Sequence, residues 1–242
     1  MLKIIAMLLM VVDHLALAFL PSYSTLYLIC RMVGRLSMPL FAYKLACGFH
    51  YTHDLKLYMK NIATMTLMAQ IPFVLLGYGK DFKEALFESR GLILIAHWNI
   101  GVTFLLALCF LYVITHLEYV GTLKKIIICF TLLLLSTVAD YGIYGILTIL
   151  LFYNFILSPN CHKLRGLFMY TLGFAMLTIL YYLMFFYDAA TFMIGIQLPA
   201  VLAIALVYWI PDFKIRLPKS FFYIFYPVHM LIIGLLTYFF SL

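Results

Sequence analysis

The sequence contains 242 residues, of which 67% are hydrophobic and only 10% are charged. Soluble globular domains are about half apolar, so this composition excludes a soluble domain and indicates an integral membrane protein. The net charge of +7 is attributed to membrane topology and to contact with anionic membrane lipids, and no nucleic-acid partner is expected.

The apolar stretches predict an all-α, polytopic membrane helix bundle. They run to roughly 20 residues without the alternation that β-barrel strands show. About nine transmembrane helices are predicted, at residues 2–20, 25–48, 57–77, 91–114, 123–138, 141–157, 166–186, 190–210 and 221–240. A re-entrant pair within 123–157 is the alternative, which changes the helix count but not its parity. We expect residues 1–242 to form a single transmembrane domain.

The basic residues between the predicted helices place the N-terminus in the cytoplasm, because Lys and Arg are retained on the cytoplasmic side. In this orientation the cytoplasmic set is Lys3, Lys56, Lys60, Lys124, Lys125, Lys163, Arg165, Lys214, Arg216 and Lys219. The outer side carries Lys80, Lys83 and Arg90, balanced by Asp81, Glu84 and Glu88. The outer segment from Tyr78 to Arg90 is expected to hold a short interfacial helix, serving as a lid, a docking element or a plain connector.

The cysteines give no metal or disulfide signal. Cys30, Cys47, Cys109, Cys129 and Cys161 show no paired spacing and mostly lie in apolar runs. They are interpreted as core thiols, and no metal site is expected.

Asp13 and His14 interrupt the first apolar run, where ionisable groups are costly and mark functional sites. Arg31 and Arg35, four residues apart, lie on one face of the next predicted helix. Asp13 is therefore expected to pair with Arg31 or with Arg35. The alternative is that this pair only joins two helices, and that His14 only bonds to helix backbone.

Lys3 and His14 are eleven residues apart, so they lie on one helical stripe about 16 Å long. This stripe suits a ligand with an anionic head at Lys3 and a reactive tail at His14. Asp13 lies about 100° around the helix from His14 and cannot easily orient it.

Later predicted helices carry further polar residues. Asn99 and Thr103 share a helical face, and such residues more often form interhelical hydrogen bonds than catalytic groups. His229 follows Pro227, which frees backbone groups beside the histidine at mid-membrane depth.

These residues carry a resemblance that extends over nearly the whole chain. Its segments are Lys3 to His14, Gly34 to Phe41, Asn99-Ile100, Tyr141 to Gly145 and Phe222 to His229. In this order and spacing the chain resembles the TraX family of membrane proteins, which are associated with N-terminal acetylation of conjugative pilin. The resemblance implies a bacterial inner-membrane location.

TraX proteins in turn resemble the acyltransferase-3 superfamily of membrane acyltransferases. In that superfamily an arginine precedes the catalytic histidine by the spacing that separates Lys3 from His14 here. Lys3 can still neutralise phosphate but lacks the bidentate geometry of an arginine.

The resemblance implies an acetyltransferase that uses acetyl-CoA as donor and a pilin amine, or another acceptor at the outer face, as partner. His14 is then the expected base, with Asp13 and Arg35 as catalytic partners. Lys3, Arg31, Arg35, Asn99 and His229 are the expected donor-binding residues, and no metal is needed. A small transporter and a non-catalytic pilus-assembly protein are the alternatives.

Overall fold

The computed structural model describes residues 1–22, 24–159, 163–186, 189–210 and 218–240. Cys161, Lys214 and Arg216, which entered the sequence predictions, lie outside this part of the chain. The described residues are predominantly helical, and Trp98 and Ala139 form an isolated β-bridge. The all-α prediction is therefore confirmed.

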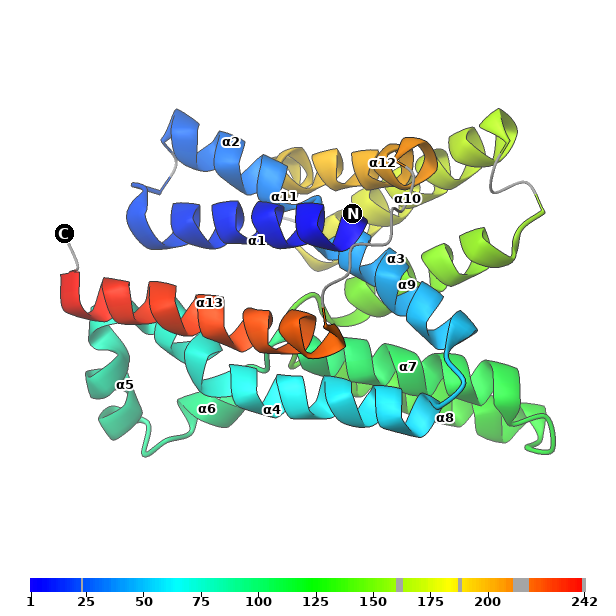
Figure 1. Cartoon of the computed structure of the whole chain (residues 1–242), viewed down its shortest axis with the longest axis horizontal. Helices are drawn as coiled ribbons and strands as arrows, with labels where there is room; N and C mark the ends of the chain where they lie inside the picture. The colour runs from blue at the N-terminus through cyan, green and yellow to red at the C-terminus, as the bar shows by residue number, and fades with distance from the viewer. Residues whose placement is uncertain (23, 160–162, 187–188, 211–217, 241–242) are drawn as a thin grey trace. The chain divides into compact units, whose positions relative to one another are not determined.

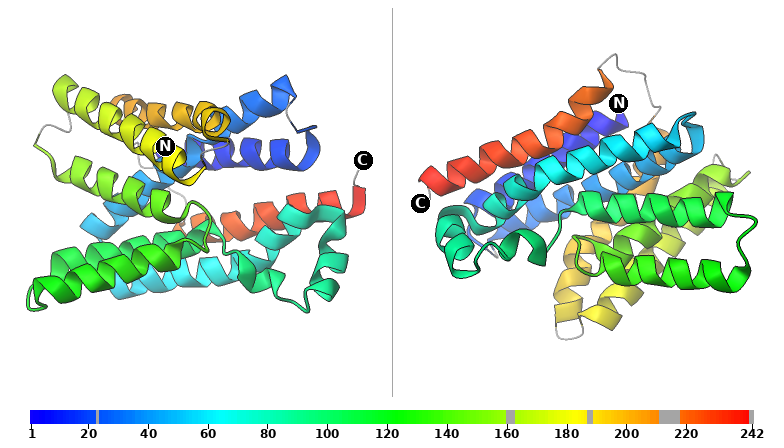
Figure 2. Two further views of the ribbon diagram at one scale, coloured as in Figure 1. Left: turned by 180° about the vertical axis from the view of Figure 1, so that it is seen from behind. Right: turned by 90° about the horizontal axis from the view of Figure 1, so that it is seen from below.

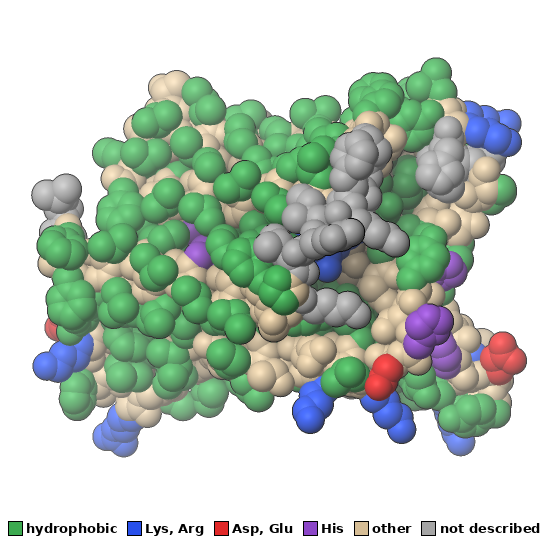
Figure 3. All heavy atoms as spheres, viewed as in Figure 1, with side chains coloured by type: hydrophobic (Ala, Val, Ile, Leu, Met, Phe, Trp, Pro, Cys, Tyr) green, Lys and Arg blue, Asp and Glu red, His purple; other side chains and the backbone are tan. Residues whose placement is uncertain are grey.

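Within the described part of the chain, five helical segments are long and apolar enough to cross a membrane: Leu2–Phe19, Leu55–Glu88, Leu164–Phe185, Thr191–Trp209 and Ser220–Phe240. Two shorter apolar helices, Ile100–His116 and Gly142–Leu157, accompany them. Many large hydrophobic side chains, among them Leu67, Phe168 and Met184, are exposed, and hydrophobic groups predominate on the face shown in Figure 3. Such a surface is stable against lipid, so the chain is a multi-pass membrane helix bundle.

The described residues group into two compact units, Met1–His50 with Leu151–Arg216, and Tyr51–Leu150 with Leu217–Leu242. We call them the first and the second unit. Each takes residues from two separate parts of the chain, and α9 (Gly142–Leu157) contributes to both. The prediction of one domain over 1–242 stays a prediction.

The first unit contains α1 (Leu2–Phe19), α2 (Thr25–Gly34), α3 (Ser37–Tyr51), the end of α9, α10 (Leu164–Phe185), α11 (Ala190–Gln197), the 3-10 helix η3 (Leu198–Val201) and α12 (Leu202–Trp209). In Figure 1, α1 and α2 lie side by side. A small core of Leu2, Ala6, Leu40 and Ala203, each at most 1% exposed, joins α1, α3 and α12. Edge-to-face aromatic pairs, Tyr43 with Phe152 and Phe152 with Phe174, continue the packing across α3, α9 and α10.

Two predicted spans of this unit are interrupted, which corrects the sequence prediction. The span at 25–48 divides into α2 and α3 at Arg35 and Leu36, and the span at 190–210 divides into α11, η3 and α12. Pro39 lies in the first turn of α3 and Pro199 in η3. A proline disfavours helical backbone just before it and fits the start of a new helix, so both interruptions have a local cause.

The second unit contains α4 (Leu55–Tyr78), η1 (Gly79–Asp81), α5 (Phe82–Glu88), α6 (Ile93–Ala96), α7 (Ile100–His116), α8 (Thr122–Ser136), the start of α9 and α13 (Lys219–Phe240). α13 packs along α4, and a Cβ on Gly234 would approach Leu75 to 2.9 Å, so the glycine permits this close contact. Figure 2 shows α7 and α8 side by side as a hairpin. The expected short helix between Tyr78 and Arg90 is present as α5.

The predicted span at 91–114 is also corrected, because its long helix begins only at Ile100. The preceding chain is irregular around Trp98, whose N–H donates to the Val138 carbonyl at 2.9 Å and whose carbonyl accepts from Asp140 N–H at 2.8 Å. Gln70 of α4 donates to the carbonyls of Leu94 and His97, both at 2.9 Å. Protein groups thus replace the missing helical hydrogen bonds of this irregular segment.

Candidate functional site

Asp13 on α1 and Arg31 on α2 form an ion pair with 2.7 Å between Oδ2 and Nη1. Each side chain is only 13% exposed. Removing either partner would leave a buried charge uncompensated, so the pair fixes α1 against α2. The expected partnership of Asp13 with one of the two arginines is confirmed for Arg31.

Gly34 permits this arrangement. A Cβ on Gly34 would overlap the Cβ and Oδ1 of Asp13, so only glycine lets α2 approach α1 this closely. Asp13 Oδ1 is buried and accepts no hydrogen bond from the described residues. Arg35 and Arg31 are both close enough for their charges to act on this carboxyl group.

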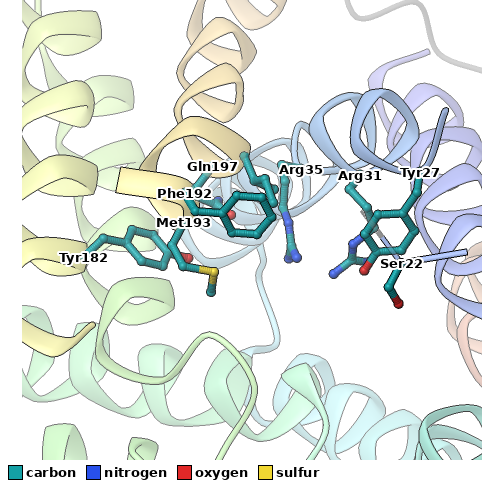
Figure 4. Close-up of a pocket in the computed structure, with 9 residues that line it drawn as sticks. Ser22, Tyr27, Arg31, Arg35, Tyr182, Phe192, Met193 and Gln197 are labelled. Carbon is teal, nitrogen blue, oxygen red and sulfur yellow. The ribbon is translucent and has the colours of Figure 1, made fainter. Parts of the chain in front are cut away.

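Both arginines line one pocket of about 240 Å³ in the first unit. The other lining residues come from the turn after α1, from α2, from the end of α10 and from α11: Ser22, Tyr27, Tyr182, Phe192, Met193, Ile196 and Gln197. In Figure 4 the guanidinium groups of Arg31 and Arg35 extend into the same space, with Phe192 and Met193 on one side and Tyr27 on the other. The pocket thus combines two cations with aromatic and apolar walls.

Two interrupted helices meet at this pocket. α2 ends at Gly34 and is capped by Arg35, whereas α11 ends at Gln197 and is followed by η3, which contacts α2. Ser37, at the start of α3, donates its hydroxyl to the Ala6 carbonyl at 2.9 Å and ties the interruption to α1. In membrane transporters, interrupted helices of this kind form binding sites near the midplane.

Lys3 and His14 lie on α1, one continuous helix, so the predicted stripe is geometrically possible. Both side chains are half-buried, and both make interactions within the structure. Neither is among the described residues that line the arginine pocket. Their roles as phosphate ligand and base stay predictions.

Asn99 belongs to the second unit and is fully buried. Its Nδ2 donates to Gln70 Oε1 at 2.8 Å and to the Thr66 carbonyl at 2.9 Å, while its Oδ1 accepts from Gly101 N–H at 2.9 Å. Thr103 donates to the Asp140 carbonyl at 2.6 Å. The expected interhelical hydrogen bonds are present, and the donor-binding role of Asn99 stays a prediction.

His229 also lies in the second unit, on α13, and is 7% exposed. Its Nδ1 is 2.9 Å from the Phe225 carbonyl, and its ring stacks on Phe225 with 5.0 Å between centroids. This is the backbone contact typical of a structural histidine in a helix. Its donor-binding role stays a prediction.

Sequence reasoning missed Gln197 and Gln70. Gln197 is 1% exposed and lines the arginine pocket, and Gln70 holds the chain before α7. Each is a single amide inside an apolar run, which is a usable signal because buried amides need partners. Among the described residues, no group of three or more His, Cys, Asp or Glu side chains could hold a metal.

The fold and this charged pocket define the class, a multi-pass helical membrane protein with an ionic site inside its helix bundle. The sequence matches the model of the TraX protein family over residues 1–237. The chain therefore belongs to the TraX family, and it is a multi-pass protein of the bacterial inner membrane.

One curated relative is the probable fimbrial assembly protein FimC, serogroup H1, of Dichelobacter nodosus. It is 31% identical over 146 residues, which cover 60% of this chain and 57% of the relative. The match thus spans little more than half of the relative's length. No solved structure matches the chain.

Proposed function

We propose that this protein is a membrane acetyltransferase that moves an acetyl group from acetyl-CoA to the N-terminal amine of a pilin subunit. The observation that carries the proposal is the pocket with Arg31 and Arg35, beside the Asp13 carboxylate on the helix of His14. Membership of the TraX family and the likeness to a fimbrial assembly protein support a pilus-related substrate.

In the proposed reaction the acceptor amine attacks the thioester carbonyl. The new C–N bond gives a tetrahedral intermediate, and the collapse of this intermediate breaks the C–S bond and releases coenzyme A as the thiolate. Neutral His14 accepts the proton of the amine and returns it to the leaving thiolate, directly or through water. Lys3 binds donor phosphates at the cytoplasmic end of α1. One of the two arginines, Arg35 or Arg31, stabilises the oxyanion of the tetrahedral intermediate, an effect that is stronger in a dry site than in water.

The decisive experiment is the intact mass of a candidate pilin co-expressed with and without this protein. The proposal predicts a gain of one acetyl group, located at the N-terminal amine by fragmentation. An unmodified pilin in the presence of correctly inserted protein would contradict it.

His14→Ala tests the base in the same assay. We expect acetylation to fall by about 10²–10⁴-fold, while the protein keeps its detergent melting temperature. His53→Ala is the matched control, because His53 is exposed and lies in the other unit. Undiminished transfer by His14→Ala would remove His14 from this role, and a lost fold would favour a structural histidine.

A non-catalytic role in pilus assembly is the second candidate, favoured by the name of the FimC relative. It predicts unmodified pilin together with defective pili when the protein is removed. It also predicts that Lys3→Arg and His14→Gln leave assembly intact.

A small carrier is the third candidate, favoured by the two interrupted helices at the pocket. It predicts uptake of acetyl-CoA or of an ion into proteoliposomes without any covalent product. Acetylated pilin formed by purified protein would exclude this candidate as the whole function.

A further inference from the structure

The arginine pocket is built from helix ends that belong to one side of the first unit. Ser22 lies in the turn between α1 and α2, and Tyr27 lies in the first turn of α2. Tyr182 lies in the last turn of α10, and Phe192 in the first turn of α11. The pocket therefore lies toward the side where α1 joins α2 and α10 joins α11.

The charges of the connecting segments identify this side as the outer one. Residues 20–24 carry no charge, and residues 186–189 carry only the acidic Asp188. At the opposite ends of α1 and α10 lie the basic residues Lys3, Lys163 and Arg165. Because basic segments are retained in the cytoplasm, the pocket lies toward the outer face.

The pocket reaches from this face into the bundle. Arg35 follows Thr25 by ten residues, and Gln197 follows Ala190 by seven, which corresponds to depths of about 15 Å and 10 Å along the helices. Gln197 is the last residue of α11 and Arg35 caps the end of α2, so both lie farther along their helices from this face than Tyr27 and Phe192 do. Lys3 lies at the other end of α1, away from the segment that joins α1 to α2.

We propose that this pocket is the acceptor site, and that it binds a carboxylate carried by the acceptor peptide close to its reactive amine. This inference rests on the proposed acetyl transfer. Both guanidinium groups line the pocket, and the Nε of Arg35 is buried without a hydrogen-bond partner among the described residues. Arginine forks bind carboxylates by two parallel hydrogen bonds, and Gln197 adds an amide to the lining of the pocket.

The size and the walls of the pocket fit this ligand. Its volume of about 240 Å³ is below the range of about 300–1,000 Å³ that drug-sized ligands occupy. It therefore accommodates a charged side chain and its neighbour rather than a whole coenzyme. The rings of Tyr27, Tyr182 and Phe192 offer apolar contact to the adjoining residues of a peptide that lies at the membrane surface.

Sidedness is tested by thiol labelling in intact spheroplasts with a membrane-impermeant maleimide. Ser22→Cys is expected to label from outside, whereas Lys163→Cys, at the start of α10, is expected to label only after permeabilisation. The parent chain, with its native cysteines, gives the background. Labelling of Lys163→Cys but not Ser22→Cys in intact spheroplasts would overturn the proposal.

Ligand chemistry is tested with full-length protein in neutral lipid vesicles and pairs of apolar peptides with a free N-terminal amine. Within a pair the peptides differ only by Glu or Gln near the amine. We expect the Glu peptide to bind about tenfold tighter or more. This difference in affinity corresponds to one charge-assisted hydrogen bond that the Gln peptide cannot form. Equal binding of the two peptides would overturn the proposal.

Arg35 variants identify the site of this preference. Arg35→Gln is expected to abolish the Glu preference and Arg35→Lys to retain part of it, so the lysine variant carries the test if the glutamine variant does not fold. Arg165→Gln is the control, because Arg165 is exposed and far along α10 from the pocket residue Tyr182. An unchanged Glu preference in both Arg35 variants would overturn the proposal.

Further readouts separate the sources of the anion. A weaker binding of acetyl-CoA by the Arg35 variants, with the peptide preference intact, would make the pocket a donor site. Loss of the preference in phosphatidylglycerol vesicles would make it a lipid headgroup site. If no peptide is acetylated while the Arg35-dependent preference persists, the proposed acetyl transfer fails and the anion site remains.

Discussion

Arg31 is the residue on which the charge balance of the pocket depends. It is paired with Asp13 at 2.7 Å, and both side chains are largely withdrawn from solvent. Arg31→Met leaves Asp13 beside lipid-facing helices without its hydrogen-bonded cation, so we expect a loss of about 3–5 kcal/mol in stability. Adding Asp13→Asn should recover part of this loss. Equilibrium unfolding in mixed micelles measures the stability of the single variants and of the double variant. If the losses of the two single variants add up in the double variant, Asp13 and Arg31 are not energetically coupled.

Gly34 gives a sharper steric test at the same contact. In Gly34→Ala the new methyl group overlaps Asp13, so α2 must move away from α1. We expect a loss of about 1–3 kcal/mol, the range for overpacked sites, together with a weaker ion pair. The detergent melting temperature measures it.

Gly173→Ala is the matched control for Gly34. Gly173 lies inside α10, and nothing lies within 4 Å of a Cβ built on it. Alanine is the better helix former by about 1 kcal/mol, so this change should leave stability equal or higher. Equal melting temperatures for the two alanine variants would contradict the close contact at Gly34.

At the residue scale, the sequence was sufficient to predict the charged residues of the site but not the other residues that line the pocket. Asp13, Arg31 and Arg35 were predictable because charges inside apolar runs are rare and need each other. Tyr182 and Phe192 were not, because aromatic residues occur throughout this chain and only the packing of α10 against α11 selects them. Gln197 was an intermediate case. The sequence shows it as a single amide inside an apolar run, but it does not indicate which residues Gln197 contacts.

At the element scale, Gln70 of α4 replaces the hydrogen bonds that a continuous helix before α7 would supply. It donates to the carbonyls of Leu94 and His97 and accepts from the N–H and Nδ2 of Asn99. Gln70→Leu removes the partner of the Leu94 and His97 carbonyls and of the Asn99 N–H, and the loss at the buried Asn99 N–H alone costs about 1–3 kcal/mol. We expect loss of folding or fast amide exchange over residues 93–103, measured by hydrogen exchange in micelles.

Thr64→Val, on the same helix, is the control for Gln70. Thr64 donates within α4, to the Lys60 carbonyl, so its replacement should leave exchange near α7 unchanged. Protection of residues 93–103 that survives Gln70→Leu would show that the other contacts suffice.

Helix boundaries were the weakest element-scale prediction, for a physical reason. The apolar composition of a segment indicates how favourably that segment transfers from water into lipid. A segment that is stable in lipid need not be one continuous helix, provided that protein groups form hydrogen bonds with the backbone where the helix is interrupted. The runs 25–48, 91–114 and 190–210 are predominantly apolar, yet the structure interrupts them near Pro39, Trp98 and Pro199. The short α5 was predictable because its charges and apolar residues alternate around one helix.

At the scale of the whole molecule, the proposed reaction requires a cytoplasmic donor and an outer acceptor, so everything depends on orientation. The prediction of a cytoplasmic N-terminus places the segment around Gly91 outside and the segment around Gly121 inside. Gly91 has a φ of +82° and lies in the turn after α5, and Gly121 caps α8. Both are interruptions where a reporter can be inserted without breaking a long helix.

Reporter fusions after these two glycines therefore test the orientation on which donor and acceptor sides depend. Alkaline phosphatase fused after Gly91 should be active, because it folds only outside the cytoplasm, and green fluorescent protein there should be dark. Fused after Gly121 the two reporters should behave in the opposite way, since Lys124 and Lys125 hold this segment inside. The reverse pattern at both positions would show that the chain has the opposite orientation. Ser22 and the arginine pocket would then lie toward the cytoplasm, and that pocket would be the natural entrance for acetyl-CoA.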